Sequence, residues 1–351
     1  MKKLLSLVLA LAVILSLCIV ASADGAKKVG VAMPTENLQR WNQDGANMKA
    51  QLEAAGYQVD LQYGANDIAT QVSQIEYMIA NGCKVLVIAS IDGDSLGTVL
   101  AQAKEAGIPV IAYDRLLTGT QNVDYYTTFD NYGVGTIQGT YVKEALDLDN
   151  AEGPFTIEFT AGSPDDNNAG LFFQGAYDVL APYIEAGKLV IKSGQTEFEQ
   201  VATPAWKSET AQARMDNILT AFYSDGTKLD VALCSNDSTA LGVTNSLISF
   251  GLSPEEMPII TGQDCDIPNT KNMIKGLQSM SVFKDTRTLA EQTVKMVGDL
   301  LEGNVPETNA TYDNGVMEVP SFNCTPVFAD VNNYEELLLD SGYYTADQLA
   351  D

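Results

Sequence analysis

The chain has 351 residues, which is long enough for two ordinary domains with sizeable cores. Its 46 acidic residues outnumber its 20 basic ones, and a formal net charge of −26 repels the phosphates of nucleic acids. The sequence contains no histidine, which excludes Ser-His-Asp catalysis and zinc sites built on histidine ligands.

The first 23 residues have the order of an export signal. Met1-Lys2-Lys3 is basic, residues 4–20 are almost all apolar, and Ala21-Ser22-Ala23 supplies the small residues of a cleavage site. Cleavage after this triplet removes two lysines and brings the formal charge from −26 to −28. An uncleaved anchor or a lipid on Cys18 are the alternatives, although Leu17 is bulky for a residue preceding a lipidated cysteine. No later stretch is long and apolar enough to span a bilayer, so we expect an exported protein.

Short apolar runs alternate with amphipathic segments in the first part of the chain. Buried strands are predicted at 29–33, 59–62, 85–89 and 110–113. Helices are predicted between them, at 44–55, 69–81 and 96–106, because apolar residues recur there at intervals of three and four. Gly56, Gly82 and Gly107 follow these helices, as expected for the left-handed residue that ends a helix.

A second series of the same kind follows. Strands are predicted at 156–159, 189–191, 231–233 and 259–261, and helices at 168–186, 209–223 and 238–250. Repeated strand-helix units joined by right-handed crossovers build parallel sheets. The sequence therefore predicts an α/β fold with two doubly wound parallel-sheet lobes.

The residues that follow the strands are polar and rich in hydrogen-bonding groups. Ligands of such sheets bind beyond the carboxyl ends of the strands. Carboxylates, amides and guanidinium groups match the hydroxyls of a sugar, and the only two tryptophans, Trp41 and Trp206, suit the apolar faces of its ring. Taken singly, each residue could be a cap, a turn or core packing, but their shared position favours a polar sugar-binding cleft. They are Arg40-Trp41, Ser90-Ile91-Asp92-Gly93, Asp114-Arg115, the run 162–168, Ser235-Asn236-Asp237, Gly262-Gln263-Asp264 and 282–287.

These segments resemble the periplasmic xylose-binding and multiple-monosaccharide-binding proteins. The resemblance includes Ala112-Tyr113, just before Asp114, and Phe283-Lys284. Those proteins are type I periplasmic binding proteins of ABC sugar importers, and the resemblance runs from about residue 28 to the C-terminus. It implies two lobes that close around a sugar by hinge bending, with three chain crossings near Asp130, Asp266 and Tyr312. Residues 24–130 with 267–311 are then the N-terminal lobe, and 131–266 with 312–351 the C-terminal lobe and its extension.

The resemblance also implies the residues that hold the sugar. The set comprises Arg40, Asp114 and Arg115 from the first lobe, Asp166, Asn168, Trp206, Asn236 and Asp264 from the second, Lys284 near the hinge, and Trp41 and Asp92 along the pocket wall. Trp206 is expected to stack on a face of the ring.

The function expected is capture of a monosaccharide, an aldopentose or aldohexose, and its delivery to an ABC permease without chemistry. A monomer is expected, and the negative charge argues against nucleic acid as a partner. No cofactor or metal ion is expected, because the sequence has no complete calcium-loop motif and no phosphate-loop motif. A sugar sensor that contacts a chemoreceptor or a sensor kinase is one alternative. A glycoside hydrolase is another, but it needs two carboxyl groups that face one bond, and no such pair stands out.

Two features are left open by the sequence. Cys83, Cys234, Cys265 and Cys324 form no C-x-x-C pair, and they fit either disulfides or buried free thiols. The segment 310–351 is expected to add a helix around Tyr334 and a tail with Tyr343-Tyr344, both packed outside the cleft.

Overall fold

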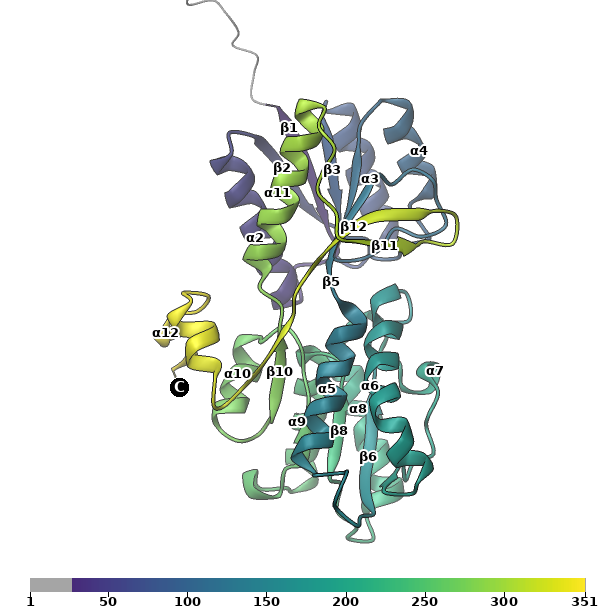
Figure 1. Cartoon of the computed structure of the whole chain (residues 1–351), viewed down its shortest axis with the longest axis vertical. Coiled ribbons are helices and arrows are strands. Elements are labelled where there is room, and N and C mark those ends of the chain that lie inside the picture. The colour runs from purple at the N-terminus through teal and green to yellow at the C-terminus, as the bar shows by residue number, and fades with distance from the viewer. Residues whose placement is uncertain (1–26, 351) are drawn as a thin grey trace, which may run out of the picture.

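The computed structural model describes residues 27–350, which fold into two α/β lobes stacked one on the other (Figure 1). The predicted export signal, with its cleavage site and Cys18, lies outside the described residues. Within 27–350, none of the helices combines the length and the apolar character that a membrane crossing requires.

The first lobe is built on a seven-stranded sheet in the order β11-β12-β5-β4-β3-β1-β2. Its strands are β1 (Lys28–Met33), β2 (Gln58–Tyr63), β3 (Val85–Ile88), β4 (Val110–Tyr113), β5 (Tyr125–Phe129), β11 (Ala310–Asp313) and β12 (Glu318–Cys324). All neighbours pair in parallel except β11 and β12, which are antiparallel. The helices are α2 (Gln39–Ala54), α3 (Ile68–Ala80), α4 (Gly97–Glu105) and α11 (Thr286–Glu302), of which α11 packs on α2.

The second lobe has a four-stranded parallel sheet in the order β7-β6-β8-β9. Its strands are β6 (Phe155–Thr160), β7 (Leu189–Val190), β8 (Val231–Cys234) and β9 (Ile259–Ile260). A bridge from Gln263 to Val282 continues it to β10 (Met280–Phe283), which pairs antiparallel with β13 (Val327–Asp330). The helices are α5 (Asn131–Ala145), α6 (Asn167–Glu185), α7 (Phe198–Val201), α8 (Ser208–Ile218), α9 (Asp237–Phe250) and α10 (Ile267–Ile274).

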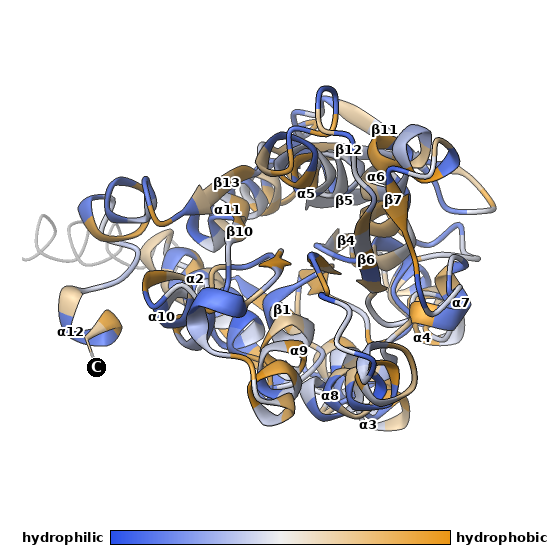
Figure 2. Cartoon of the chain, turned by 90° about the horizontal axis from the view of Figure 1, so that it is seen from below, coloured by the Kyte–Doolittle hydropathy of each residue, from blue (hydrophilic) through white to orange (hydrophobic). Residues whose placement is uncertain are grey.

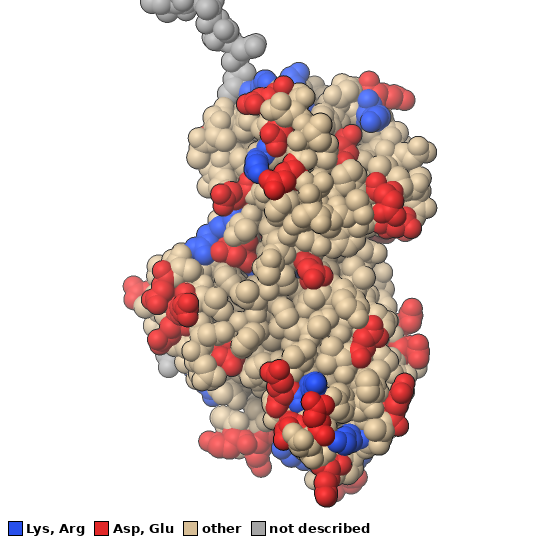
Figure 3. All heavy atoms as spheres, in the orientation of Figure 1, with Lys and Arg blue, Asp and Glu red and all other residues tan. Residues whose placement is uncertain are grey.

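Several short helical turns complete the chain: η1 (Pro204–Trp206), η2 (Leu219–Tyr223), η3 (Pro254–Glu256), η4 (Glu335–Asp340) and α12 (Ala346–Leu349). The predicted helix 209–223 is thus α8 followed by the wider π-helical turn η2. Seen from below in Figure 2, apolar strands occupy the centre and helices surround them. Figure 3 shows acidic side chains spread over both lobes, so the high negative charge is carried by the solvated surface.

The predicted α/β fold with two parallel-sheet lobes is confirmed, and most predicted elements lie within a few residues of the observed ones. The largest shift is at α2, which begins at Gln39 and not at 44, because Arg40, Trp41 and Asp44 are buried on its inner side. Gly56 has a φ of 88°, the left-handed conformation predicted for the residue after a helix.

The chain crosses between the lobes at three places. The first is Asp130, between β5 and α5. The second and third were predicted too early, at Asp266 and Tyr312. Because α10 packs on α9 and β10 extends the second sheet, the chain crosses at 284–285; because β12 pairs with β5, it crosses again at 325–326. Residues 267–283 therefore belong to the second lobe and 312–324 to the first.

The four cysteines within 27–350 are all buried and unpaired, which answers the question that their spacing left open. Burial raises the pKa of their thiols, to about 11 for Cys83 and Cys324 and to about 12 for Cys234.

Candidate functional site

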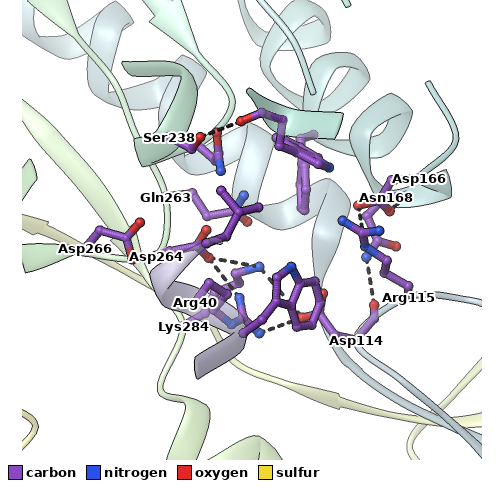
Figure 4. Close-up of a pocket in the computed structure, with 15 residues that line it drawn as sticks. Arg40, Asp114, Arg115, Asp166, Asn168, Ser238, Gln263, Asp264, Asp266 and Lys284 are labelled. Atoms are coloured by element: carbon purple, nitrogen blue, oxygen red, sulfur yellow. Dashed lines mark hydrogen bonds and ion pairs between the residues drawn. The ribbon is translucent and has the colours of Figure 1, made fainter. Parts of the chain in front are cut away.

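A pocket between the two lobes brings together every predicted site residue except Asp92 (Figure 4). The first lobe contributes the side chains at the start of α2 and after β4. The second contributes those after β6, β8 and β9 and at η1, and Lys284 enters from the second crossing. The lining residues are Leu38, Arg40, Trp41, Asp114, Arg115, Asp166, Asn168, Phe172, Trp206, Asn236, Ser238, Gln263, Asp264, Asp266 and Lys284.

Two of the second-lobe residues are held in place because they also begin helices. Asp166 is the N-cap of α6 and accepts a hydrogen bond from the Asn168 backbone N–H at 3.0 Å. Asn236 is the N-cap of α9 and accepts one from the Thr239 N–H, also at 3.0 Å. Their capping bonds fix both side chains beyond the strand ends, where they line the pocket.

Three site residues adopt a left-handed backbone, with φ of 59° at Asp114, 56° at Trp206 and 97° at Asp264. This conformation costs roughly 1–3 kcal/mol in a residue with a side chain and is concentrated at ligand sites. Backbone hydrogen bonds hold it here, among them Asp114 N–H to Thr127 O at 2.7 Å and Asp264 N–H to Val282 O at 2.8 Å. The surrounding fold therefore fixes the directions of these side chains.

The guanidinium of Arg40 joins the lobes across the pocket. Its Nη2 donates to Asp114 Oδ2 of its own lobe at 2.7 Å, and its Nη1 donates to Asp264 Oδ1 of the second lobe at 2.8 Å. The Nε donates to the buried carboxylate of Asp44, which fixes the plane of the Arg40 guanidinium group. Lys284 Nζ lies 3.3 Å from the same Asp264 oxygen and 3.8 Å from Asp114 Oδ2.

Arg115 makes a second connection between the lobes. Its Nε lies 3.0 Å from Asp166 Oδ2, with an orientation that makes the contact an ion pair and not a hydrogen bond. Its Nη1 donates to the carbonyl oxygens of Ser90 and Ile91, at 3.0 and 3.2 Å. Nearby, Asn168 Nδ2 donates to the backbone oxygen of Asp114 at 2.7 Å.

The prediction that Asp92 lines the pocket is wrong. Its carboxylate accepts hydrogen bonds from the Asp94 N–H at 2.9 Å and from the Ser95 hydroxyl at 2.8 Å. A short acidic side chain in a turn caps the nearby backbone, and this local bond turns it away from the site. The loop after β3 supports the site instead through the two carbonyls that hold Arg115.

Both tryptophans are 4% exposed and line the pocket. The Arg115 guanidinium carbon lies 5.1 Å from the centroid of the Trp41 ring, and Phe172 meets Trp206 edge-on at 6.2 Å. The Trp206 ring rests directly on Gly162, where an added Cβ would lie 1.9 Å from a ring carbon. The glycine therefore makes room for the indole.

Charge balance sets the protonation of the pocket carboxyls. Burial alone would raise the pKa of Asp114, but Arg40, Lys284 and Arg115 bring it below its ordinary value. Burial raises the pKa of Asp166 despite the opposing charge of Arg115. Burial also raises the pKa of Asp44, to about 6, against the influence of Arg40. The pocket thus combines charged acceptors with fixed cationic donors.

Five lining residues were not among the predicted sugar-binding residues, although one of them, Gln263, belongs to a polar run noted after a strand: Leu38, Phe172, Ser238, Gln263 and Asp266. Gln263 and Asp266 lie within two residues of the predicted Asp264, and Phe172 lies one helical turn after the predicted Asn168. Their closeness in the sequence to predicted site residues could have identified them. Gln263 Oε1 and Asp266 Oδ1 are buried without a hydrogen-bond partner among the residues that the structure describes. Within the same range, no cluster of three or more acidic or cysteine side chains is arranged to hold a metal ion.

Comparisons with known proteins agree with this arrangement. The periplasmic binding protein domain matches residues 29–304. The chain is 51% identical to the multiple sugar-binding periplasmic receptor ChvE of Rhizobium radiobacter, over 99% of this chain and all of that one. It is 34% identical to the D-xylose-binding periplasmic protein of Escherichia coli, with the same coverage. A solved ABC transporter solute-binding protein from Clostridium phytofermentans, with bound β-D-glucose, is 64% identical and has a TM-score of 0.90, covering 92% of this chain and 100% of that one.

Proposed function

The chain belongs to the periplasmic binding protein family, and from this membership we propose that it captures a monosaccharide between its lobes and delivers it to an ABC transporter permease. It is a binding protein and not an enzyme. The observation that carries the proposal is the pocket itself, in which two indoles and a ring of carboxylate, amide and cationic groups converge from both lobes.

The chemistry of the lining fits a sugar ring. Hydroxyl groups both donate and accept, so they are bound by acceptor-only carboxylates next to donor-only guanidinium and ammonium groups. Asp114 and Asp264 supply such acceptors beside Arg40 and Lys284. The unpartnered Gln263 Oε1 is a further acceptor for a sugar hydroxyl. The apolar C–H faces of a pyranose match the rings of Trp41 and Trp206.

We propose the same residue roles that the sequence suggested, with Asp92 removed and Gln263 added. Arg40, Asp114 and Arg115 act from the first lobe, and Asp166, Asn168, Trp206, Asn236 and Asp264 act from the second, with Trp41 and Lys284 completing the pocket. Glucose bound to the relative from Clostridium phytofermentans, and D-glucose bound to one from Chloroflexus aurantiacus at 35% identity, support an aldose as the ligand.

Closure of the cleft is the proposed mechanism. Arg40 meets Asp264, and Arg115 meets Asp166, only when the lobes are together, so an opened cleft exposes all four charged groups. A sugar that bonds to both lobes shifts the population to the closed form. Hydrogen bonds to charged groups contribute roughly 1.5–3 kcal/mol each. A handful of them, with ring stacking, is enough for the roughly 8 kcal/mol of a micromolar complex.

A thermal-shift screen of residues 24–351 tests the proposal. The panel contains aldopentoses, aldohexoses, uronic acids, nucleosides and amino acids. A ligand that binds only the folded state at a thousandfold excess over its Kd stabilises that state by about 4 kcal/mol. We expect a clear rise of Tm with one or a few aldoses. A rise with a nucleoside or an amino acid, and with no aldose, would overturn the proposal.

The N-terminal segment has a proposed role of its own. We propose that residues 1–23 direct export and are removed, so that the mature chain begins at Asp24 and acts outside the inner membrane. The intact mass of the secreted protein tests this. A mass that includes a lipid on Cys18 would contradict the cleavage site.

A further inference from the structure

The C-terminal extension, residues 334–350, packs on the second lobe beside the hinge (Figure 1). Leu338, Tyr344 and Leu349 are buried against Cys265 and Phe283 of that lobe. The periplasmic binding protein domain ends its match at residue 304, so the extension lies beyond the part that the domain describes. The apolar contacts anchor it to one lobe only.

Polar groups of the extension nevertheless reach the first lobe. Ser341 and Tyr343 contact Arg287 and Thr286 of α11, and the Tyr344 hydroxyl bonds to both lobes at once. Tyr344 Oη accepts hydrogen bonds from Gln39 Nε2 and Gln43 Nε2, both at 2.8 Å, and donates to the Cys265 backbone oxygen at 2.9 Å. Gln39 and Gln43 lie on α2 of the first lobe, one turn apart, while Cys265 is in the second lobe. A phenolic hydroxyl has one donor and two acceptor positions, so all of its bonding capacity is used here.

Neighbouring contacts reinforce the connection. Gln39 Oε1 accepts from the Ile267 backbone N–H of the second lobe at 3.1 Å. Tyr343 Oη donates to Gln43 Oε1 at 3.2 Å, and its ring lies edge-on to Phe283 at 4.8 Å. Together, the two tyrosines tie the first turns of α2 to the second lobe.

The same turns of α2 carry the sugar site. Gln39 and Gln43 flank Arg40 and Trp41 along the helix, and Cys265 directly follows Asp264, the carboxylate that Arg40 bonds across the cleft. Tyr344 does not line the pocket. Its hydroxyl therefore joins the same two segments that the Arg40 to Asp264 pair joins.

Resting on the proposed function, we infer that Tyr344 is a positioning residue for sugar binding, which latches α2 to the second lobe and holds the cleft closed around the sugar. A latch that forms only in the closed state raises affinity without touching the ligand, because it stabilises the state that binds. It acts on the release of the sugar, since the hydroxyl must be freed before the lobes separate.

The test uses residues 24–351 with D-glucose or whichever aldose gives the largest thermal shift. Tyr344→Phe removes the hydroxyl and keeps the ring packed. We expect the Kd to rise by about five- to fiftyfold, in line with loss of a shared buried hydrogen bond, and the dissociation rate in stopped-flow tryptophan fluorescence to rise by a similar factor. The matched control is Tyr334→Phe, because the Tyr334 hydroxyl donates to the side chain of its neighbour Glu335 and, within residues 27–350, makes no bond to the first lobe; this variant is expected to bind as wild type.

A second variant keeps the inference testable if Tyr344→Phe fails to fold. Gln43→Met removes a partner from the first-lobe side, and this variant alone is expected to raise the dissociation rate. Where both variants fold, a double-mutant cycle is expected to show effects that overlap rather than add. Wild-type dissociation rates in either variant, fully additive losses, or an equal loss in Tyr334→Phe would overturn the inference while leaving the proposed function intact. A wild-type chain that binds no aldose would instead overturn the proposed function.

Discussion

Replacement of Gly162 by alanine is expected to displace the Trp206 ring. A Cβ at Gly162 would lie 1.9 Å from Trp206 Cη2, 2.2 Å from Cζ2 and 2.3 Å from Cζ3. Carbon atoms in contact are about 3.5–4.0 Å apart, so the ring has to move by roughly 1.5–2 Å. Gly162 has no left-handed backbone, so alanine adds no strain of that kind, and the three atoms nearest to its Cβ all belong to Trp206.

The displacement is expected to weaken sugar binding at least tenfold, equivalent to about 1.4 kcal/mol. Trp206 is 4% exposed, lines the pocket and packs on Phe172, so a shift of this size changes the wall on which we propose that the sugar stacks. Overpacking of this kind also costs about 1–3 kcal/mol of folding stability. Calorimetric titration with the preferred aldose gives the affinity, and thermal unfolding separates it from the loss of stability.

Gly170→Ala is the matched control. Gly170 lies on α6, where an added Cβ meets nothing within 4 Å, and alanine is favoured over glycine in a helix by about 1 kcal/mol. This variant is expected to bind as wild type with unchanged or slightly higher Tm. Trp206→Ala is expected to lose at least as much affinity as Gly162→Ala. Wild-type affinity in Trp206→Ala or in a folded Gly162→Ala would refute the stacking role of Trp206.

Three further predictions concern Asp92, Asp44 and the buried cysteines. Asp92→Ala is expected to keep the affinity within about twofold, because its carboxylate bonds to Asp94 and Ser95 outside the pocket; a tenfold loss by titration would contradict this. The pKa of Asp44 is about 6 in the folded chain, against an ordinary value of 3.8. Between these two pH values the folded chain holds a proton on Asp44 that the unfolded chain has released. The stability that this proton contributes is therefore lost as the pH rises from about 4 to about 6. The unfolding free energy of wild type relative to Asp44→Asn should therefore fall by about 2 kcal/mol between pH 4 and pH 6 in urea titrations, and a flat difference would be inconsistent with the raised pKa. Thiol reagents should modify the four described cysteines slowly in the native chain and completely in the denatured chain, because their thiols are buried and have raised pKa values: Cys83, Cys234, Cys265 and Cys324. Fast labelling of the native chain would contradict this by showing that the thiols are accessible.

The periodic elements were predictable because their patterns are local. Buried strands such as β3 and β4 are short apolar runs, and helices such as α3 show apolar residues three and four apart, ending before a left-handed glycine. The second and third crossings were not predictable in this way. They depend on β10 joining the second sheet and β12 joining the first, which are pairings between segments far apart in the sequence.

The site was predictable as a list and not as a geometry. Ten of the eleven residues predicted from the sequence line the pocket, most of them because the strand ends of parallel sheets converge. Asp92 follows a strand too, but a bond within its own turn redirects it. The left-handed backbone of Asp114 and Asp264, and the pairing of Arg40 with a carboxylate of the other lobe, come from tertiary contacts that no local pattern encodes.

A crystal structure of residues 24–351 grown with D-glucose or the preferred aldose tests the central claim most directly. The account predicts one sugar ring enclosed between the lobes, in contact with Trp41 and Trp206, with hydroxyls on Arg40, Asp114 and Asp264. An unoccupied pocket at a sugar concentration that saturates binding in solution, or a sugar bound outside the cleft, would contradict it.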